Sequence, residues 1–140
     1  MNTKLLMIST AAVFGISGLF LQFMPHEILN SFGTPAVGVN PLLVQMIGSL
    51  YLGFAMMNWM AKTVLIGGIY ARPLAMGNFV HFMVGGLALL KFTLQTPNSI
   101  ILWGLTVIYS IFALCFGFVF FTNPLKKNEK DPRGVLPLDK

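Results

Sequence analysis

Four long apolar runs follow one another along the chain, and polar residues are confined almost entirely to the segments between and after them. The runs cover residues 5–24, 41–61, 73–95 and 99–122. A hydrocarbon core of about 30 Å is crossed by about 20 helical residues. In lipid such runs must be helices, because no water is present to satisfy an open backbone. The pattern therefore predicts an all-α fold in which residues 1–122 form a four-helix transmembrane bundle.

Proline, asparagine and glycine mark the expected ends of these helices. Pro25 ends the first run, and Asn40 followed by Pro41 is typical of a helix start, with a capping side chain before proline at the first helical position. Residues 26–32 are expected to form a short interfacial helix that Gly33 stops. Because the connections are short, sequential helices are predicted to be antiparallel neighbours.

Small residues recur at helical spacing inside every run. Lipid tails are as apolar as leucine, so close backbone approach at small residues is the expected source of helix association. We expect these faces to pack the helices of one chain together, with a dimer surface as the alternative. The faces are Ala11, Gly15, Gly18 and Gln22; Gly48, Leu52 and Ala55; Gly77, His81, Gly85 and Ala88; and Thr106, Ser110, Ala113 and Gly117.

The composition agrees with a protein embedded in a membrane. Of all residues, 56% are hydrophobic and only 9% are charged, and the mean hydropathy is +0.78. Soluble domains carry about 25% charged residues, so this chain has too few polar side chains to cover a water-exposed surface. The first apolar run is longer than the roughly 7–15 residues usual for a signal peptide, so we expect it to remain as an uncleaved helix.

The positions of the basic residues predict an orientation. Eight of the nine Lys and Arg residues fall on one side of the predicted spans, and Lys91 alone lies toward the other. Basic residues accumulate on the cytoplasmic side, so both termini should be cytoplasmic, with residues 123–140 as a mobile cytoplasmic tail. The net charge of +5 comes from these flanking positions, so the lipid bilayer, and not nucleic acid, is the expected partner. The eight are Lys4, Lys62, Arg72, Lys126, Lys127, Lys130, Arg133 and Lys140.

A few polar side chains fall inside the second and third spans. Tyr51 and Asn58 share a face of the second, and Asn78 and His81 are one turn apart on the third. Counted from the cytoplasmic helix ends, all four lie between about 5 and 15 Å deep, and Arg72 lies just below them. Polar residues at membrane depth indicate a functional site by default. Either the cluster is a ligand-binding pocket open to the cytoplasmic leaflet, or it is a network of interhelical hydrogen bonds.

On the outer side, two charged residues form a second candidate. Glu27 is the only acidic residue before the tail, and Lys91 lies near the outer end of the third span. Lys91 is expected either to extend its side chain to the membrane surface or to form an ion pair with Glu27.

The sequence offers no metal site and no catalytic constellation. His81 has no second histidine or carboxylate at its depth, His26 falls on the far side, and Cys115 is the only cysteine. No acidic residue lies within a span, so a Ser-His-Asp arrangement cannot be built there. We therefore assign no catalytic residue and expect neither a metal nor a cofactor.

Three segments carry a resemblance to known proteins: LYLGFAMMNW at 50–59, GGIYARP at 67–73 and GNFVHF at 77–82. They resemble uncharacterised small four-helix membrane proteins of bacteria, over about residues 50–92. The layout of residues 1–122 is loosely similar to the DoxX-like superfamily, with a glycine-containing turn and an arginine between the second and third spans. The resemblance implies a location in the bacterial inner membrane and a role as an accessory subunit or assembly helper. It implies no catalytic residue.

Three functions remain in competition at this point. The first is a non-enzymatic accessory or assembly factor, or a binder of a lipid-like ligand, partnered by another membrane protein or by a second copy of the chain. The second is a membrane enzyme that acts on a quinone- or isoprenoid-like substrate through the cluster centred on His81. The third is a subunit of an oligomeric small transporter or channel.

Overall fold

The computed structural model describes residues 3–63 and 72–121, and every regular element in these ranges is helical. The chain divides into two compact units, residues 1–64 and 65–140. The predicted cytoplasmic tail at 123–140 and most of the connection between the second and third spans lie outside the described residues.

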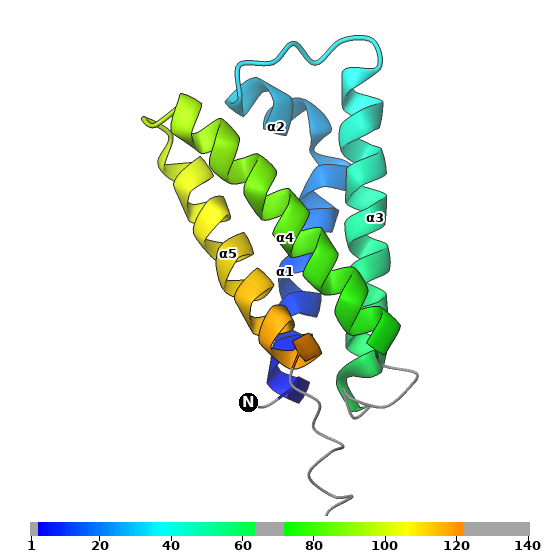
Figure 1. The fold of residues 1–140 in the computed structure, drawn as a ribbon. Helices are drawn as coiled ribbons and strands as arrows, with labels where there is room; N and C mark the ends of the chain where they lie inside the picture. The colour runs from blue at the N-terminus through cyan, green and yellow to red at the C-terminus, as the bar shows by residue number, and fades with distance from the viewer. Residues whose placement is uncertain (1–2, 64–71, 122–140) are drawn as a thin grey trace, which may run out of the picture. The chain divides into compact units, whose positions relative to one another are not determined.

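The first unit contains α1 (Thr3–Phe23), α2 (Pro25–Ser31), α3 (Asn40–Met60) and the short 3-10 helix η1 (Ala61–Thr63). Helices α1 and α3 lie side by side, and α2 contacts both (Figure 1). The interfacial helix expected from the sequence is α2, and it ends where Gly33 turns the chain with a φ of +66°. Only glycine adopts this backbone conformation without steric cost, which is why the helix stops there.

The second unit contains α4 (Arg72–Gln95) and α5 (Ile100–Phe121), which also lie side by side (Figure 1). A tight turn joins them. The amide of Thr96 donates to the carbonyl of Phe92 at 3.1 Å, and the indole Nε1 of Trp103 donates to the carbonyl of Pro97 at 3.1 Å. The turn is thus tied at both ends by its own hydrogen bonds.

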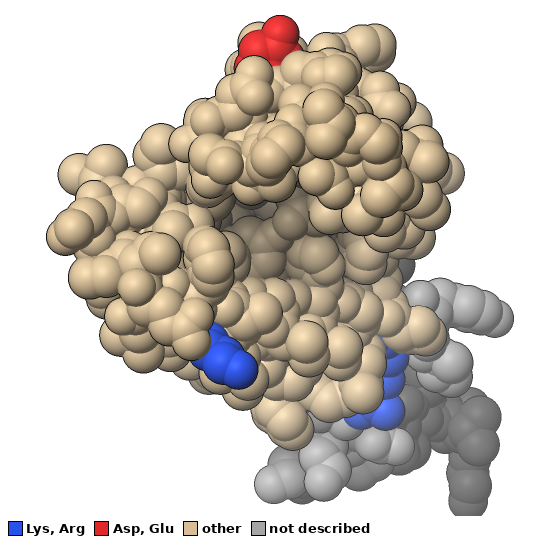
Figure 2. All heavy atoms as spheres, turned by 90° about the horizontal axis from the view of Figure 1, so that it is seen from above, with Lys and Arg blue, Asp and Glu red and all other residues tan. Residues whose placement is uncertain are grey.

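Four of these helices are long and apolar enough to cross a membrane, which confirms the expected number of spans and supports an integral multi-pass protein. The candidate spans contain 21, 24, 24 and 22 residues, and at most 33% of the residues in any of their most apolar windows are buried. Most of the large apolar side chains therefore point outward, and on the face that Figure 2 shows, charged atoms are sparse. Such a surface requires an apolar solvent.

Helices α1 and α3 approach each other through the small residues that the sequence singled out. A Cβ added at Gly18 would lie 3.0 Å from the carbonyl oxygen of Gly48, and one added at Gly15 would lie 3.7 Å from the Cβ of Ala55. The contact between the two helices runs from Gly15 beside Ala55 to Gln22 beside Gln45, so the residue number rises along α1 while it falls along α3. The predicted small-residue faces of the first two spans are confirmed.

The packing face of α4 agrees with the prediction at His81 and Gly85, which lie against Tyr109 of α5, and differs from it at Gly77 and Ala88. A Cβ added at Gly77 would have no atom within 4 Å, and Ala88 is exposed. The contact instead centres on Phe82, whose ring lies 4.9 Å from that of Phe112 and 5.9 Å from that of Phe116. Aromatic rings bury more surface than small side chains and pair favourably, so they move the buried face one position along the helix. The buried residues of α4 are Ala75, Asn78, Phe82, Gly86 and Thr93.

One predicted cap is also corrected. Asn40 is the first residue of α3, and no side chain caps this helix. The Asn40 side chain instead donates its Nδ2 to the carbonyl of Pro35 at 2.9 Å. This bond closes the loop before α3. Asn40 therefore stabilises the loop that precedes the helix and does not cap the helix itself.

Candidate functional site

The predicted polar cluster is divided between the two units. Tyr51 and Asn58 lie on α3, whereas Arg72, Asn78 and His81 lie on α4. Each half has its own set of contacts within its unit, and the meeting of the two halves stays a prediction.

On α3, Tyr51 makes an aromatic contact with α1. The ring of Tyr51 lies 5.2 Å from the ring of Phe14 in an edge-on arrangement, and the ring of Phe54 lies 5.4 Å from that of Phe14. Phe14 and Asn58 are both buried. Tyr51 therefore contributes to the packing of α1 on α3.

The half on α4 is engaged in contacts with its own helix and with α5. The amide Nδ2 of the buried Asn78 donates to the carbonyl of Leu74, one turn earlier, at 2.9 Å. The Nε2 of His81 lies 3.4 Å from the hydroxyl oxygen of Tyr109 on α5, and the two ring centroids are 5.7 Å apart. Arg72 is the exposed first residue of the helix.

Sequence reasoning did not find Tyr109 as the partner of His81. The signal lies in the paired glycines one turn further along α4. A Cβ added at Gly85 would lie 2.9 Å from Cε1 of Tyr109, and one added at Gly86 would lie 3.6 Å from its Cβ. The glycines leave room for the ring, and the ring then reaches His81. This contact favours the interhelical hydrogen-bond interpretation of His81.

A second polar contact missed by sequence reasoning joins α1 and α3 beyond their closest approach. The hydroxyl of Ser49 donates to the side-chain oxygen of Gln22 at 3.1 Å, and the Nε2 of Gln45 donates to the backbone carbonyl of Gln22 at 3.3 Å. From the sequence, Gln22 and Gln45 fall at a similar depth to Lys91, and their approach to this lysine of the second unit stays a prediction.

The predicted outer ion pair also spans the two units. Glu27 is an exposed residue of α2, and Lys91 is an exposed residue of α4. Whether Lys91 pairs with Glu27 or extends to the membrane surface therefore stays a prediction.

The first unit has an open apolar groove of about 380 Å³ between α1 and α3. Both helices supply its walls, and the groove begins next to the close contact between Gly15 and Ala55. The small side chains of Ala11 and Ala12 leave the space that larger residues would fill. The lining residues are Ile8, Ala11, Ala12, Leu52, Ala55, Met56 and Trp59.

One end of this groove carries positive charge. The Nζ of Lys62 lies 3.2 Å from the centroid of the Trp59 ring, in a cation–π contact. On the other wall, the exposed Lys4 precedes Ile8 by four residues of α1, so the two side chains share a face. Because α1 contacts η1, the two lysines lie at the same end of the groove.

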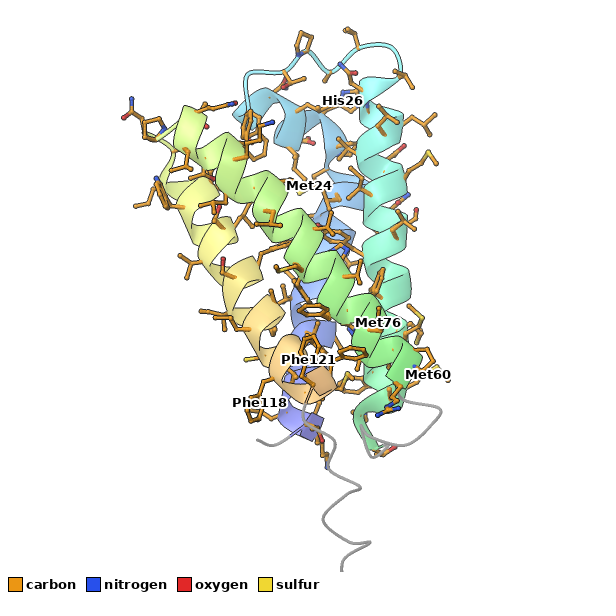
Figure 3. The ribbon with its side chains drawn as sticks, in the orientation of Figure 1. Met24, His26, Met60, Met76, Phe118 and Phe121 are labelled. Carbon is orange, nitrogen blue, oxygen red and sulfur yellow. The ribbon has the colours of Figure 1, made fainter. Side chains whose placement is uncertain are left out.

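The described residues contain no group of three or more His, Cys, Asp or Glu side chains that could hold a metal ion. His26 is exposed on α2, at the end of the first unit away from Met60 and therefore away from the two lysines (Figure 3). It takes no part in the groove.

Comparisons with protein-family models, with curated proteins and with solved structures found no match to this chain. The candidate site thus rests on the geometry of the chain itself. Its clearest element is the groove of the first unit, which sequence reasoning did not predict.

Proposed function

We propose that the chain is an integral membrane protein that holds a lipid-like molecule in the groove between α1 and α3 and carries out no chemical step on it. The single observation that carries the proposal is the groove itself, with apolar walls from two helices and a volume of about 380 Å³. Binding sites for small molecules usually enclose about 300–1,000 Å³ and are lined mainly by apolar side chains. An acyl or isoprenoid chain matches this lining.

The proposal includes an arrangement in the membrane. The four spans form an antiparallel bundle with both termini in the cytosol, in the inner membrane of a bacterium, as in the DoxX-like layout. Support comes from the four candidate spans and from the eight basic residues on one side against Lys91 on the other. The lysine-bearing end of the groove then faces the cytoplasmic leaflet.

We propose that the protein, with its bound lipid, has an accessory function, such as helping to assemble a membrane-protein partner. The competing proposal of an enzyme centred on His81 has weaker support, because the contact of His81 with Tyr109 of α5 is one of helix packing. The proposal of a transporter subunit rests on the span count alone.

Native mass spectrometry of the protein extracted in mild detergent tests lipid binding in the groove. Ala12 is exposed and lines the groove, so Ala12→Phe fills the space without entering the contact between α1 and α3. We expect the natural protein to retain a lipid-like molecule and Ala12→Phe to lose it.

Ala88→Phe is the matched control, since Ala88 is an exposed alanine of α4 and has no part in the groove. It should retain the molecule as the natural protein does. Equal retention by Ala12→Phe and Ala88→Phe would overturn the proposal, as would a natural protein that carries no lipid under conditions in which its helices stay folded.

A further inference from the structure

A positively charged side chain lies at the end of the groove formed by Trp59. Trp59 is the last lining residue on α3, and Lys62, three residues later, holds its ammonium group 3.2 Å from the centre of that indole ring. The contact fixes the position of a cation beside the groove. An ammonium group carries three N–H donors. The Lys62 ammonium can therefore contact the Trp59 ring and still donate hydrogen bonds to an anion.

The groove wall on α1 also ends beside a lysine. Ile8 is its first lining residue, and Lys4 lies one turn before it on the same face. The contact between α1 and η1 brings the turn that carries Lys62 beside the start of α1. An apolar channel therefore leads to two lysines, one from each helix, in a unit whose only described acid is Glu27 on α2.

We infer that the groove is a binding site for one anionic phospholipid, with an acyl chain between α1 and α3 and the headgroup phosphate between Lys62 and Lys4. The inference deepens the proposed function and rests on it: the apolar groove accounts for the chain, and the two lysines select the headgroup. Charge complementarity excludes a zwitterionic lipid as the preferred occupant, because its ammonium or choline group would meet two cations.

The second hollow on α3 lacks these features. It measures about 410 Å³, but its walls come from α3 alone. No second helix is therefore present in its walls to bring a further basic residue to a headgroup; the lining residues are Met46, Ser49, Leu50, Gly53, Phe54 and Met57. It provides an apolar surface without a site for a headgroup.

Fluorescence quenching by brominated lipids tests the inference directly, because Trp59 lies in the groove wall and Trp103 is the only other tryptophan. The protein with Trp103→Phe is placed in vesicles of phosphatidylcholine and phosphatidylglycerol. Either the phosphatidylglycerol or an equal mole fraction of the phosphatidylcholine carries brominated chains. We expect brominated phosphatidylglycerol to quench Trp59 more strongly. The Trp59→Phe protein, which retains Trp103, should show no such preference.

Lys62→Gln should lower the preference for phosphatidylglycerol at Trp59 by about fivefold, the effect expected for one basic residue near anionic headgroups. Lys62→Arg keeps the charge and the stacking on the ring, so it should retain the preference. Lys91→Gln is the matched control, an exposed lysine of α4 outside the groove, and should leave quenching of Trp59 unchanged. Circular dichroism confirms that each variant keeps its helices.

The outcomes separate this inference from the proposed function. Equal quenching by both lipids, reduced in both cases by Ala12→Phe, would mean a groove that binds lipid without selecting the headgroup; the inference would then be wrong and the proposed function would stand. Quenching that Ala12→Phe does not reduce would mean that no lipid occupies the groove, for example because a partner helix fills it, and would overturn both.

Discussion

The hydroxyl oxygen of Thr93 on α4 lies 2.9 Å from the hydroxyl oxygen of Thr106 on α5, and both side chains are buried. Thr106 also lies in position to donate to the carbonyl of Leu102 at 2.8 Å. A hydroxyl has one proton to donate, so when Thr106 donates to Leu102, Thr93 donates to Thr106. Two adjacent helices are thus joined by a hydrogen bond between two buried hydroxyl groups.

We predict a measurable coupling between these two threonines. In a double-mutant cycle with Thr93→Val and Thr106→Val, the coupling free energy of unfolding should be about 0.6 kcal/mol and no more than about 1.7 kcal/mol, the range found for hydrogen bonds between membrane helices. Unfolding in mixed detergent micelles, followed by circular dichroism, gives the four free energies. Thr96→Val is the control, because the exposed Thr96 bonds only within its own turn, to Phe92, and its coupling to Thr106→Val should be near zero. A coupling of zero for Thr93 would contradict the prediction.

The contact between α1 and α3 predicts a large effect from one methyl group. A Cβ at Gly48 would lie 2.8 Å from the backbone nitrogen of Gln22 and 3.0 Å from the carbonyl oxygen of Gly18. Backbone atoms cannot move aside as a side chain end can, so Gly48→Ala should lower the free energy of unfolding by about 1–3 kcal/mol. The same unfolding measurement gives the value.

Gly53→Ala provides the matched comparison on the same helix. No atom lies within 4 Å of a Cβ built at Gly53, and alanine favours a helix over glycine by about 0.5–1 kcal/mol. Gly53→Ala should therefore leave stability unchanged or raise it slightly. If both variants lost stability equally, the close backbone approach at Gly48 would not be what holds the two helices together.

The role of His81 predicts a separation between stability and function. His81→Gln retains a side chain able to hydrogen-bond with Tyr109, whereas His81→Ala removes the contact and part of the packing. We expect His81→Ala to destabilise the protein by more than the roughly 0.6 kcal/mol of an average interhelical hydrogen bond. Lipid retention in native mass spectrometry and cellular function should persist in both variants. A folded His81→Ala protein that retained lipid but lost cellular function would favour the enzyme centred on His81.

The proposed orientation predicts which residues a membrane-impermeant thiol reagent can reach. In a Cys115→Ser background the chain has no other cysteine, and Ser31 and Thr63 are exposed residues at the ends of α2 and η1. Ser31→Cys should react in intact cells and Thr63→Cys only after the cells are opened. The reverse pattern would place the basic ends of the spans outside the cytosol and contradict the topology.

The helix boundaries could be predicted closely from the sequence because proline and glycine mark them. Pro25 predicts the end of the first run, and α1 ends at Phe23. Gly33 predicts the end of the interfacial helix, and α2 ends at Ser31 before the left-handed turn at Gly33. These signals act locally, through the restricted dihedral angles of proline and the freedom of glycine, so one sequence suffices to read them.

The packing of α4 on α5 could not be predicted in the same way. Of the predicted face, His81 and Gly85 do lie against Tyr109, but Gly77 has no neighbouring atom and Ala88 is exposed. The contact centres on Phe82, which the pattern of small residues did not indicate. Which face of a helix packs depends on the shapes of side chains in another helix, distant along the chain. The groove escaped prediction for the same reason, since it is the space left where the side chains of α1 and α3 fail to fill their interface.

The contact of Gly18 with Gly48 lies entirely within the first 64 residues of the chain. Both partners have been synthesised before translation reaches α4. The first pair of helices can therefore associate during insertion, while the ribosome is still producing the remainder of the protein. A groove of such early origin would be available to lipid as soon as α3 has entered the bilayer beside α1.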